Sequence, residues 1–348
     1  MYKSLANYDY ARNYNCRISE SIVGDGVRQV ALENRFLRIA VLAGKGTDVS
    51  EFLYKPLDID FMWHSFNGLR SPENTAPGFP CPESTFLDVY EGGWQELFPS
   101  IGAPSGYKGG NIGMHGEVCL SVWDYIVELN TQQEIRVKFW TRTLRTPYLL
   151  EKWMTLKSGD PVLFIHERVT NAGGEDEQFM WGHHPAFGPI FLDESCELLI
   201  GTENSVYPKV IPYNKCELEN GRTWNWPTAY DKNGNKLDLS RLRGPSDKRY
   251  IEYAVSGLEC GRYEIYNHNY GVGFGMEWDI ELFPYLWVWE PACGCAGYPW
   301  YGRDYACAIE PWSALPDSLD KVVREGRGMR LAPGDSIETD LTACAVVR

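Results

Sequence analysis

The segment YLLEKWMTLKSGDPVLFIHERVTN, residues 148–171, decides the fold class. Each half has the composition and length of a β-strand, and neither half has the spacing of an amphipathic helix. Gly159 and Asp160 supply turn chemistry between the halves, and Pro161 begins the return. We therefore predict a β-hairpin, with His166 in its second strand.

Alternation of apolar and polar residues with a period of two is also found before and after this hairpin. In EIRVKFWTRT (134–143), Ile135, Val137 and Phe139 share one face, as in a half-buried strand. A second hairpin is predicted over 261–278, turning near 267–269, and a Pro-Gly-Asp turn precedes a final strand within 330–347. The best helix candidate, SALPDSLDKVVREG (313–326), is short. Many short strands with few helices predict an all-β protein built as a large antiparallel β-sandwich.

Length and sequence pattern favour one domain over residues 1–348, with 1–29 as a less certain N-terminal extension. Irregular stretches rich in Gly and Pro lie at 67–84, 99–113 and 290–304, and in a β-scaffold such loops tend to form the walls of a site. The sequence leaves the oligomeric state open.

Composition limits the class of partner. The formal net charge is −14, which argues against nucleic acid or an anionic membrane, because both partners need a basic face. The chain has 13 Trp and 21 Tyr, many for its length, and flat aromatic faces suit the C–H groups of a sugar. A small neutral or locally compensated ligand fits best.

The N-terminal segment lacks a basic region followed by an apolar one, and no apolar run is long enough to cross a bilayer. We therefore expect a cytoplasmic protein whose 10 cysteines are mostly buried, reduced thiols. The closest pair, Cys293 and Cys295, does not have the spacing of a zinc or redox motif.

Three residues are candidates for chemistry. They are His115 in GMHGEV, His184 in WGHHPAFGP (181–189) and Glu310 in ACAIEPWSA, where the carboxylate follows small apolar residues. Each also has a structural interpretation: either histidine can be a hydrogen-bonded core residue, and Glu310 can pair with an arginine. His183 precedes His184, and adjacent strand residues point to opposite faces, so only one of them is expected to act. His64, His166 and His268 are interpreted as structural or surface residues.

The order of the motifs GGWQELFPS, MHGEV, VTNAGG, HHPAFGP, AIEPWS and LAPGDS resembles that of the aldose 1-epimerase (galactose mutarotase-like) superfamily. The resemblance runs from about Val30 to the C-terminus. It implies a β-supersandwich that binds a pyranose and a reaction without cofactor or metal. This sequence departs from the family where His183 replaces an asparagine and where Asn34-Arg35 lacks a glycine-rich context, so the sugar stays open.

The resemblance also implies roles. His184 matches the catalytic acid, His115 the histidine that helps hold the ring oxygen, and Glu310 the general base. Asp247 is the best match to a sugar-orienting aspartate. Gln95, Trp94 and Trp312 are expected to bind substrate. Five cations lie in segments that could reach the site and leave a phosphorylated or acidic sugar open: Arg241, Arg243, Lys248, Arg249 and Arg303.

Interconversion of anomers requires removal of the C1 hydroxyl proton and protonation of the ring oxygen, which opens the ring. We expect a carboxylate base and an imidazolium acid, on opposite sides of the ring, to do this and to exchange roles on closure.

Three alternatives remain. A metal-dependent cupin-type enzyme would use His115 and Glu117, two residues apart, with a histidine of the tandem. A non-catalytic carbohydrate-binding protein needs aromatics and hydrogen bonds but no matched acid and base. A lyase or glycosidase would need a second carboxylate or a tyrosine at the scissile bond.

Overall fold

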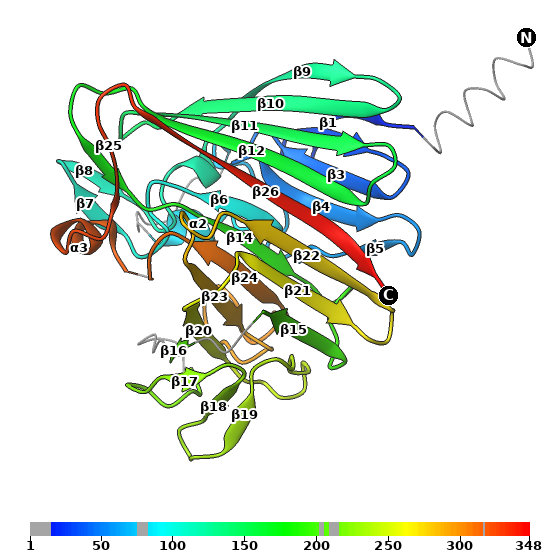
Figure 1. The fold of residues 1–348 in the computed structure, drawn as a ribbon, viewed down its shortest axis with the longest axis vertical. Helices are drawn as coiled ribbons and strands as arrows, with labels where there is room; N and C mark the ends of the chain where they lie inside the picture. The colour runs from blue at the N-terminus through cyan, green and yellow to red at the C-terminus, as the bar shows by residue number, and fades with distance from the viewer. Residues whose placement is uncertain (1–14, 75–82, 202–204, 209–215, 316) are drawn as a thin grey trace, which may run out of the picture.

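The computed structural model of the protein describes residues 15–74, 83–201, 205–208, 216–315 and 317–348. Strands dominate these residues, and all of their ladder pairings between named strands are antiparallel. Two large sheets pack against each other (Figure 1). The predicted all-β architecture is confirmed.

The larger sheet has twelve strands among the described residues, in the order β1-β2-β3-β4-β6-β14-β24-β23-β20-β16-β17, with β5 paired to β4. Its strands are β1 (Arg17–Val23), β2 (Val27–Glu33), β3 (Leu37–Leu42), β4 (Asp48–Tyr54), β5 (Ile59–Asp60), β6 (Trp94–Leu97), β14 (Gly182–Phe187), β16 (Ser205–Pro208), β17 (Trp224–Asn225), β20 (Ile251–Ser256), β23 (Tyr285–Glu290) and β24 (Cys307–Trp312).

The second sheet has eight strands in the described part of the chain, in the order β15-β21-β22-β26-β12-β11-β10-β9. They are β9 (Asp124–Asn130), β10 (Glu134–Arg142), β11 (Tyr148–Lys157), β12 (Val162–Asn171), β15 (Cys196–Ile200), β21 (Arg262–Asn267), β22 (Val272–Trp278) and β26 (Ser336–Val347). Figure 1 shows β26, in red, running across the molecule between β12 and β22.

Smaller elements complete the described fold. Three two-stranded ribbons pair β7 (Ser105–Tyr107) with β8 (Gly110–Ile112), β13 (Glu177–Phe179) with β25 (Met329–Leu331), and β18 (Thr228–Tyr230) with β19 (Lys236–Asp238). The helices are α2 (Ser84–Leu87), α3 (Leu319–Arg324) and a 3-10 turn at Val118–Leu120.

The strand predictions match the structure. β11 and β12 form the expected hairpin, in which Trp153 lies opposite His166. Ile135, Val137 and Phe139 of β10 are fully buried, as their shared face requires. β21 and β22 form the second hairpin, whose turn lies at 268–271, just beyond the expected centre.

The helix prediction over 313–326 is correct only at its C-terminal end. Ser313 belongs to the sheet instead, because its backbone N–H donates to the carbonyl of Trp181 at 2.9 Å. Its hydroxyl in turn accepts from the N–H of Trp181 at 2.8 Å. These bonds extend the pairing of β14 with β24 past Trp312, so the helix begins only at Leu319.

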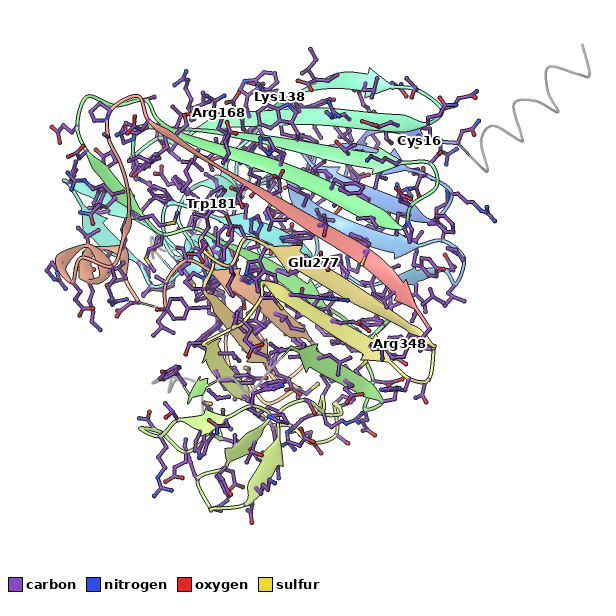
Figure 2. All side chains as sticks on the ribbon, in the orientation of Figure 1. Cys16, Lys138, Arg168, Trp181, Glu277 and Arg348 are labelled. Atoms are coloured by element: carbon purple, nitrogen blue, oxygen red, sulfur yellow. The ribbon has the colours of Figure 1, made fainter. Side chains whose placement is uncertain are left out.

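The core lies between the two sheets, where side chains fill the space densely (Figure 2). Phe52 of β4 and Phe61, which follows β5, meet Phe274 of β22 with ring centroids 5.1 and 5.7 Å apart. Each such side chain contributes roughly 1.5–3 kcal/mol by leaving water. This packing fixes which face of β14 and β24 turns inward and which turns away.

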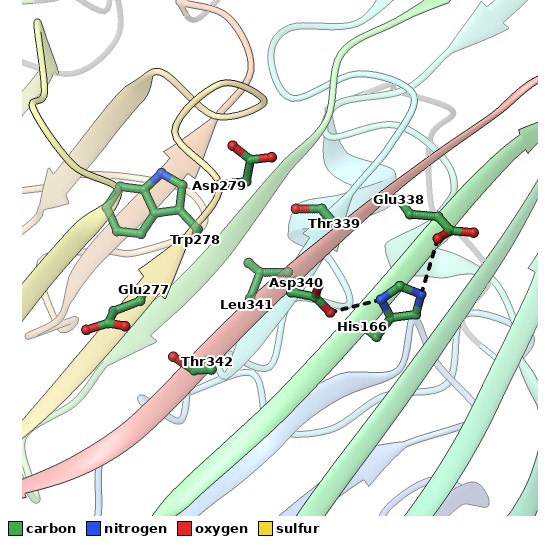
Figure 3. Close-up of a pocket in the computed structure, with 9 residues that line it drawn as sticks. All are labelled: His166, Glu277, Trp278, Asp279, Glu338, Thr339, Asp340, Leu341 and Thr342. Atoms are coloured by element: carbon green, nitrogen blue, oxygen red, sulfur yellow. Dashed lines mark hydrogen bonds and ion pairs between the residues drawn. The ribbon is translucent and has the colours of Figure 1, made fainter.

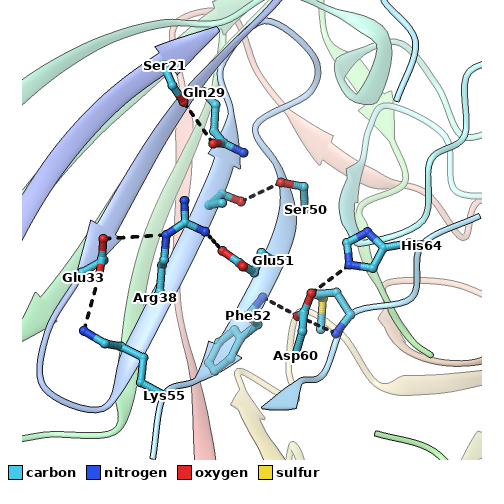
Figure 4. Close-up of polar contacts among 12 residues, drawn as sticks. Ser21, Gln29, Glu33, Arg38, Ser50, Glu51, Phe52, Lys55, Asp60 and His64 are labelled. Carbon is cyan, nitrogen blue, oxygen red and sulfur yellow. Dashed lines mark hydrogen bonds and ion pairs between the residues drawn. The ribbon is translucent and has the colours of Figure 1, made fainter. Parts of the chain in front are cut away.

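The N-terminal strands belong to the same sheet. Residues 1–14 lie outside the described residues, while the rest of the predicted extension forms β1 and starts β2. Figure 4 shows Glu33 of β2 between Arg38 and Lys55, and Arg17 of β1 also pairs with it at 2.8 Å. These ion pairs tie β1, β2 and β3 together at the sheet end.

Among the described residues, no helix has the length and apolar character needed to cross a membrane. The cysteines of the described residues are all free thiols, and most are buried, as expected.

Candidate functional site

His184 and Glu310 lie side by side on the face of the larger sheet that turns away from the eight-stranded sheet. His184 belongs to β14 and Glu310 to the adjacent strand β24. The Nε2 atom of His184 is 3.4 Å from an Oε atom of Glu310, and both side chains are almost completely buried. The structure therefore brings together two residues that are 126 positions apart in the sequence.

His115 joins this pair from a loop. Its ring centroid is 5.6 Å from that of His184, with the planes tilted by 67°. The Nδ1–H of His115 donates to the carbonyl of Ile101 at 2.8 Å, so the ring has a fixed orientation. Gly116, at φ +86°, makes this possible, because a Cβ there would stand 2.2 Å from the carbonyl oxygen of Phe98.

Tyr90 is the fourth member of the group. Its phenol oxygen is 3.2 Å from Nδ1 of His184, and the two rings meet edge to face at 86°. His184 therefore contacts Tyr90 through one ring nitrogen and Glu310 through the other. We call His115, His184, Glu310 and Tyr90 the His184 cluster.

Aromatic rings surround the His184 cluster. Phe86 stacks on Tyr90 at 4.8 Å and meets His115 at 4.6 Å. Trp300 contacts Tyr90, Trp63 and Trp289, and Trp289 lies 6.4 Å from His184. The many aromatic residues of the sequence thus partly gather around these titratable groups.

Burial sets the charge of the cluster. Removal from water, together with repulsion from the neighbouring His115, lowers the pKa of His184 to about 3. Burial raises the pKa of Tyr90 well above its ordinary value, and the nearby carboxylates of Glu310 and Glu91 add to the effect. At neutral pH, His184 is therefore an uncharged imidazole and Tyr90 an intact phenol.

These observations correct two expectations. The sequence suggested that His184 and Glu310 stand on opposite sides of a sugar ring, but adjacent strands bring them within 3.4 Å on one sheet face. It also suggested a charged imidazolium, whereas burial keeps His184 neutral without a ligand. The two groups therefore lie together on one face of the sheet.

Two of the four expected substrate-binding residues accompany the cluster. Gln95 is the register partner of His184 on β6, so both share a face. Its amide N–H donates to the carbonyl of Gly92. Trp312 lies two residues after Glu310 and stacks on Trp287 with the rings 5.4 Å apart.

The structure does not bring the other two residues to this group. Trp94 points between the sheets, where its indole N–H donates to Nδ1 of His183 at 3.3 Å. Asp247 lies 3.6 Å from Arg243, and its side chain is 43% exposed. Side chains alternate between the two faces along β6, so Trp94 points inward because its neighbour Gln95 points outward.

His183 belongs to a buried charge network, not to the His184 cluster. Its Nε2 lies 3.0 Å from a carboxylate oxygen of Glu167 on β12. Lys152 lies between Glu167 and Glu96, at 3.4 and 2.8 Å. The expectation that His183 and His184 point to opposite faces of their strand is confirmed.

Sequence reasoning missed Tyr90 and Asp304. Tyr90 directly precedes the motif EGGWQELFPS but carries no motif signal of its own. Asp304 lies at the end of the predicted wall 290–304, in a turn closed by the N–H of Arg303 and the carbonyl of Trp300 at 3.1 Å. Burial raises its pKa to about 6.

The remaining histidines pair with carboxylates outside the His184 cluster. His166 lines a hollow on the outer face of the eight-stranded sheet, between Asp340 at 2.9 Å and Glu338 (Figure 3). His64 lies 2.8 Å from Asp60 near β5, and this contact raises its pKa (Figure 4). His268 lies 2.8 Å from Glu197.

The ligand set of a cupin-type enzyme is not assembled. Glu117 accepts hydrogen bonds from the N–H groups of Leu144 and Arg145 and from the hydroxyl of Thr146, at 2.8–3.0 Å. Its carboxylate is therefore committed to a loop. In the described part of the chain, no group of three or more His, Cys, Asp or Glu residues is placed to hold a metal ion.

Three of the five candidate cations have carboxylate partners: Arg241 with Glu197, Arg243 with Asp247, and Arg249 with Glu217. Arg303 instead lies over the exposed rings of Phe66 and Tyr301, at 4.8 and 5.9 Å.

Solved structures share this fold. A protein provisionally named an aldose 1-epimerase, from Klebsiella pneumoniae, superposes with a TM-score of 0.76 at 16% identity, over 97% of this chain and 86% of that one. A galactose mutarotase-like protein from Clostridium acetobutylicum superposes with a TM-score of 0.66 at 15% identity, over 97% of this chain and 100% of that one. A galactose mutarotase related enzyme from Lactobacillus acidophilus superposes with a TM-score of 0.61 at 16% identity, over 91% of this chain and 97% of that one.

No curated protein matches the chain significantly. A family model described as a domain of unknown function, DUF4432, matches residues 24–344. The chain shares the fold of these structures, as the resemblance in motif order implied. The chain therefore belongs to the DUF4432 family.

Proposed function

We propose that the protein is an aldose 1-epimerase, which opens and recloses the ring of an aldose by acid/base catalysis. The observation that carries this proposal is the 3.4 Å contact between His184 and Glu310, buried among aromatic rings beside His115. A carboxyl group and an imidazole at this distance can serve two oxygen atoms bonded to the same carbon, as C1 of a pyranose requires.

The proton count closes when Nδ1 of His184 keeps its proton and the pair carries one further, transferable proton. In the form with a neutral imidazole, this proton is on Glu310, which protonates the ring oxygen while the lone pair on Nε2 of His184 takes the C1 hydroxyl proton. In the other form, the proton is on Nε2, and the imidazolium protonates the ring oxygen while the Glu310 carboxylate takes the hydroxyl proton. Ring closure on either face of the aldehyde reverses the same transfers, so the enzyme is regenerated without a cofactor.

His115 supports this assignment as a second contact for the ring oxygen. The ring oxygen can only accept, and Nδ1–H of His115 already donates to the carbonyl of Ile101, so His115 would contact the ring oxygen through Nε2–H of its protonated form. Repulsion from this charge contributes to the low pKa of His184.

Polar atoms around the cluster support a hydroxylated ligand. Oε1 of Gln95, Nε1 of Trp312 and Oδ1 of Asp304 are buried without a hydrogen-bond partner in the described residues. Buried polar atoms are normally paired, and the hydroxyl groups of a sugar can both donate and accept. We propose that Gln95, Trp312 and Asp304 receive such hydroxyls.

The test is an NMR exchange experiment on α and β anomers across neutral, phosphorylated and uronic aldoses. The wild type should accelerate exchange for at least one class, and Glu310→Gln should reduce the rate by a factor of about 10² or more. His166→Asn, which removes an imidazole from the outer sheet face, is the matched control and should leave the rate unchanged. A wild type without any effect on exchange refutes the proposal.

A second function, non-catalytic sugar binding, is favoured by one observation: the resting His184 is uncharged and is not a ready acid. In that case Glu310→Gln binds sugar as the wild type does, and neither protein accelerates exchange. Ligand-detected NMR on the same sugar panel measures the binding.

A further inference from the structure

We propose that Tyr90 is a positioning residue, whose phenol holds Nδ1 of His184 and keeps Nε2 directed at Glu310 through the catalytic cycle. The inference rests on the proposed function. It begins from two contacts of the His184 ring: the Tyr90 oxygen lies 3.2 Å from Nδ1, and a Glu310 oxygen lies 3.4 Å from Nε2.

A phenol suits this position because it can donate or accept a hydrogen bond. When the single ring proton of His184 is on Nε2, the hydroxyl of Tyr90 donates to the lone pair of Nδ1. When Nδ1 is protonated, the same oxygen accepts from it after the hydroxyl hydrogen rotates. The contact therefore survives each change of protonation, and the imidazole does not need to turn.

Tyr90 is itself held firmly. Its ring stacks on Phe86 and meets Trp63 and Trp300 edge to face, at 4.8, 5.4 and 6.1 Å. Its carbonyl oxygen accepts the hydroxyl of Ser65 at 2.7 Å. These contacts fix the ring on both sides.

The next residue anchors the chain. Glu91 is 2.6 Å from the ammonium group of Lys45, which is completely buried and also lies 2.5 Å from Asp48. Separating one partner of a buried ion pair costs more than breaking a surface pair, so this contact resists displacement of the backbone beside Tyr90.

The phenol does not supply the catalytic proton. Burial holds its pKa far above neutral, so loss of its proton would be costly. All proton transfers of the reaction remain among Glu310, His184 and the sugar, and Tyr90 only orients the imidazole.

Tyr90→Phe removes the hydroxyl and keeps the ring. We expect kcat for anomer exchange to fall by about 10- to 100-fold while KM changes by less than about threefold, because the substrate contacts stay in place. Tyr148→Phe is the matched control. Tyr148 is 1% exposed, and its hydroxyl has no hydrogen-bond partner in the described residues. Tyr148→Phe should leave kcat within about twofold of the wild-type value.

A second measurement does not depend on activity. The ¹⁵N resonance of His184 Nδ1 should move in Tyr90→Phe, whereas that of His183, whose partners are Trp94 and Glu167, should not. An unchanged kcat, an unchanged Nδ1 resonance, or an equal loss of kcat in Tyr148→Phe would each overturn the proposal. If the wild type exchanges no sugar, the proposed function fails, and the resonance alone decides whether Tyr90 holds His184.

Discussion

His183 and His184 are neighbours in the chain but occupy different chemical environments. His184 faces Glu310 and Tyr90, and His183 faces Glu167 across the core. Strand alternation alone separates them, because consecutive side chains leave opposite faces of a sheet.

This separation predicts opposite phenotypes. His184→Asn should slow anomer exchange by about 10² or more with the fold retained, because it removes one proton carrier. His183→Asn should instead cost about 3 kcal/mol of unfolding free energy, because Glu167 loses a partner in the core. NMR exchange and urea denaturation of both variants measure the two effects. A catalytic loss in a stably folded His183→Asn would reverse the assignment.

The low pKa of His184 also predicts an acid dependence of stability. The unfolded chain protonates this residue near pH 6.5, whereas the folded protein does so only near pH 3. Between these values the unfolded state binds more protons, so the free energy of unfolding falls as pH falls. The loss should be about 1.4 kcal/mol per pH unit from this residue. Urea midpoints of wild type and His184→Asn at pH 6, 5 and 4 should therefore converge. Parallel pH profiles would contradict the lowered pKa.

The sequence predicted part of the site because some residues lie in recognisable motifs. His115, His184 and Glu310 were identified in this way, and the structure brings them together. Tyr90 was not, since its contact with His184 spans 94 positions and depends on how the loop before β6 packs. Asp247 matches the family only by its position between motifs, which says nothing about where its side chain points.

At the scale of elements, the loop that carries His115 depends on one glycine. A Cβ at position 116 would stand 2.2 Å from the carbonyl oxygen of Phe98, and φ is +86° there. Gly116→Ala should therefore cost more than about 2 kcal/mol and displace His115, which lowers the exchange rate as well.

The matched control is Gly109→Ala in the turn between β7 and β8. Its φ is +89°, but nothing lies within 4 Å of the added Cβ, so it measures backbone strain alone, about 1 kcal/mol. Thermal unfolding and NMR exchange of both variants decide the matter. Equal losses of stability in the two variants would mean that the backbone at Phe98 shifts to accommodate the added Cβ at little cost.

The type of each element could be predicted from the local sequence pattern, but the residues at which an element begins or ends could not. β10 and the β11–β12 hairpin were predictable because their apolar period is 2 and Gly159 marks the turn. The start of α3 was not, because Ser313 pairs with Trp181, which is 132 positions away. A tertiary contact of this kind leaves no trace in the neighbouring residues.

At the scale of the molecule, one charge network joins the two sheets through the core. Lys152 and Glu167 come from the eight-stranded sheet, while Glu96 and His183 come from the larger one. Glu96 also accepts the indole N–H of Trp181 at 2.8 Å. Because the side chains are nearly fully buried, the energy of the network depends on every member keeping its partner.

Lys152→Met tests how much the sheet packing depends on this cation. Removal of one partner leaves Glu96 and Glu167 together in the core without a compensating charge, which should cost about 3–5 kcal/mol. Lys138→Met is the matched control, since Lys138 pairs with Glu151 at 2.6 Å on the outer face of the same sheet.

Partial exposure of Lys138 to water makes the expected cost of its loss less than about 1 kcal/mol. Urea midpoints of the two variants, measured with the wild type, give the comparison. The difference between the two midpoints reports the effect of burial on the ion pair, because both substitutions remove the same charge from neighbouring strands of one sheet. If Lys152→Met is no less stable than Lys138→Met, the apolar packing of the sheets suffices, and the buried charges serve only to orient β14.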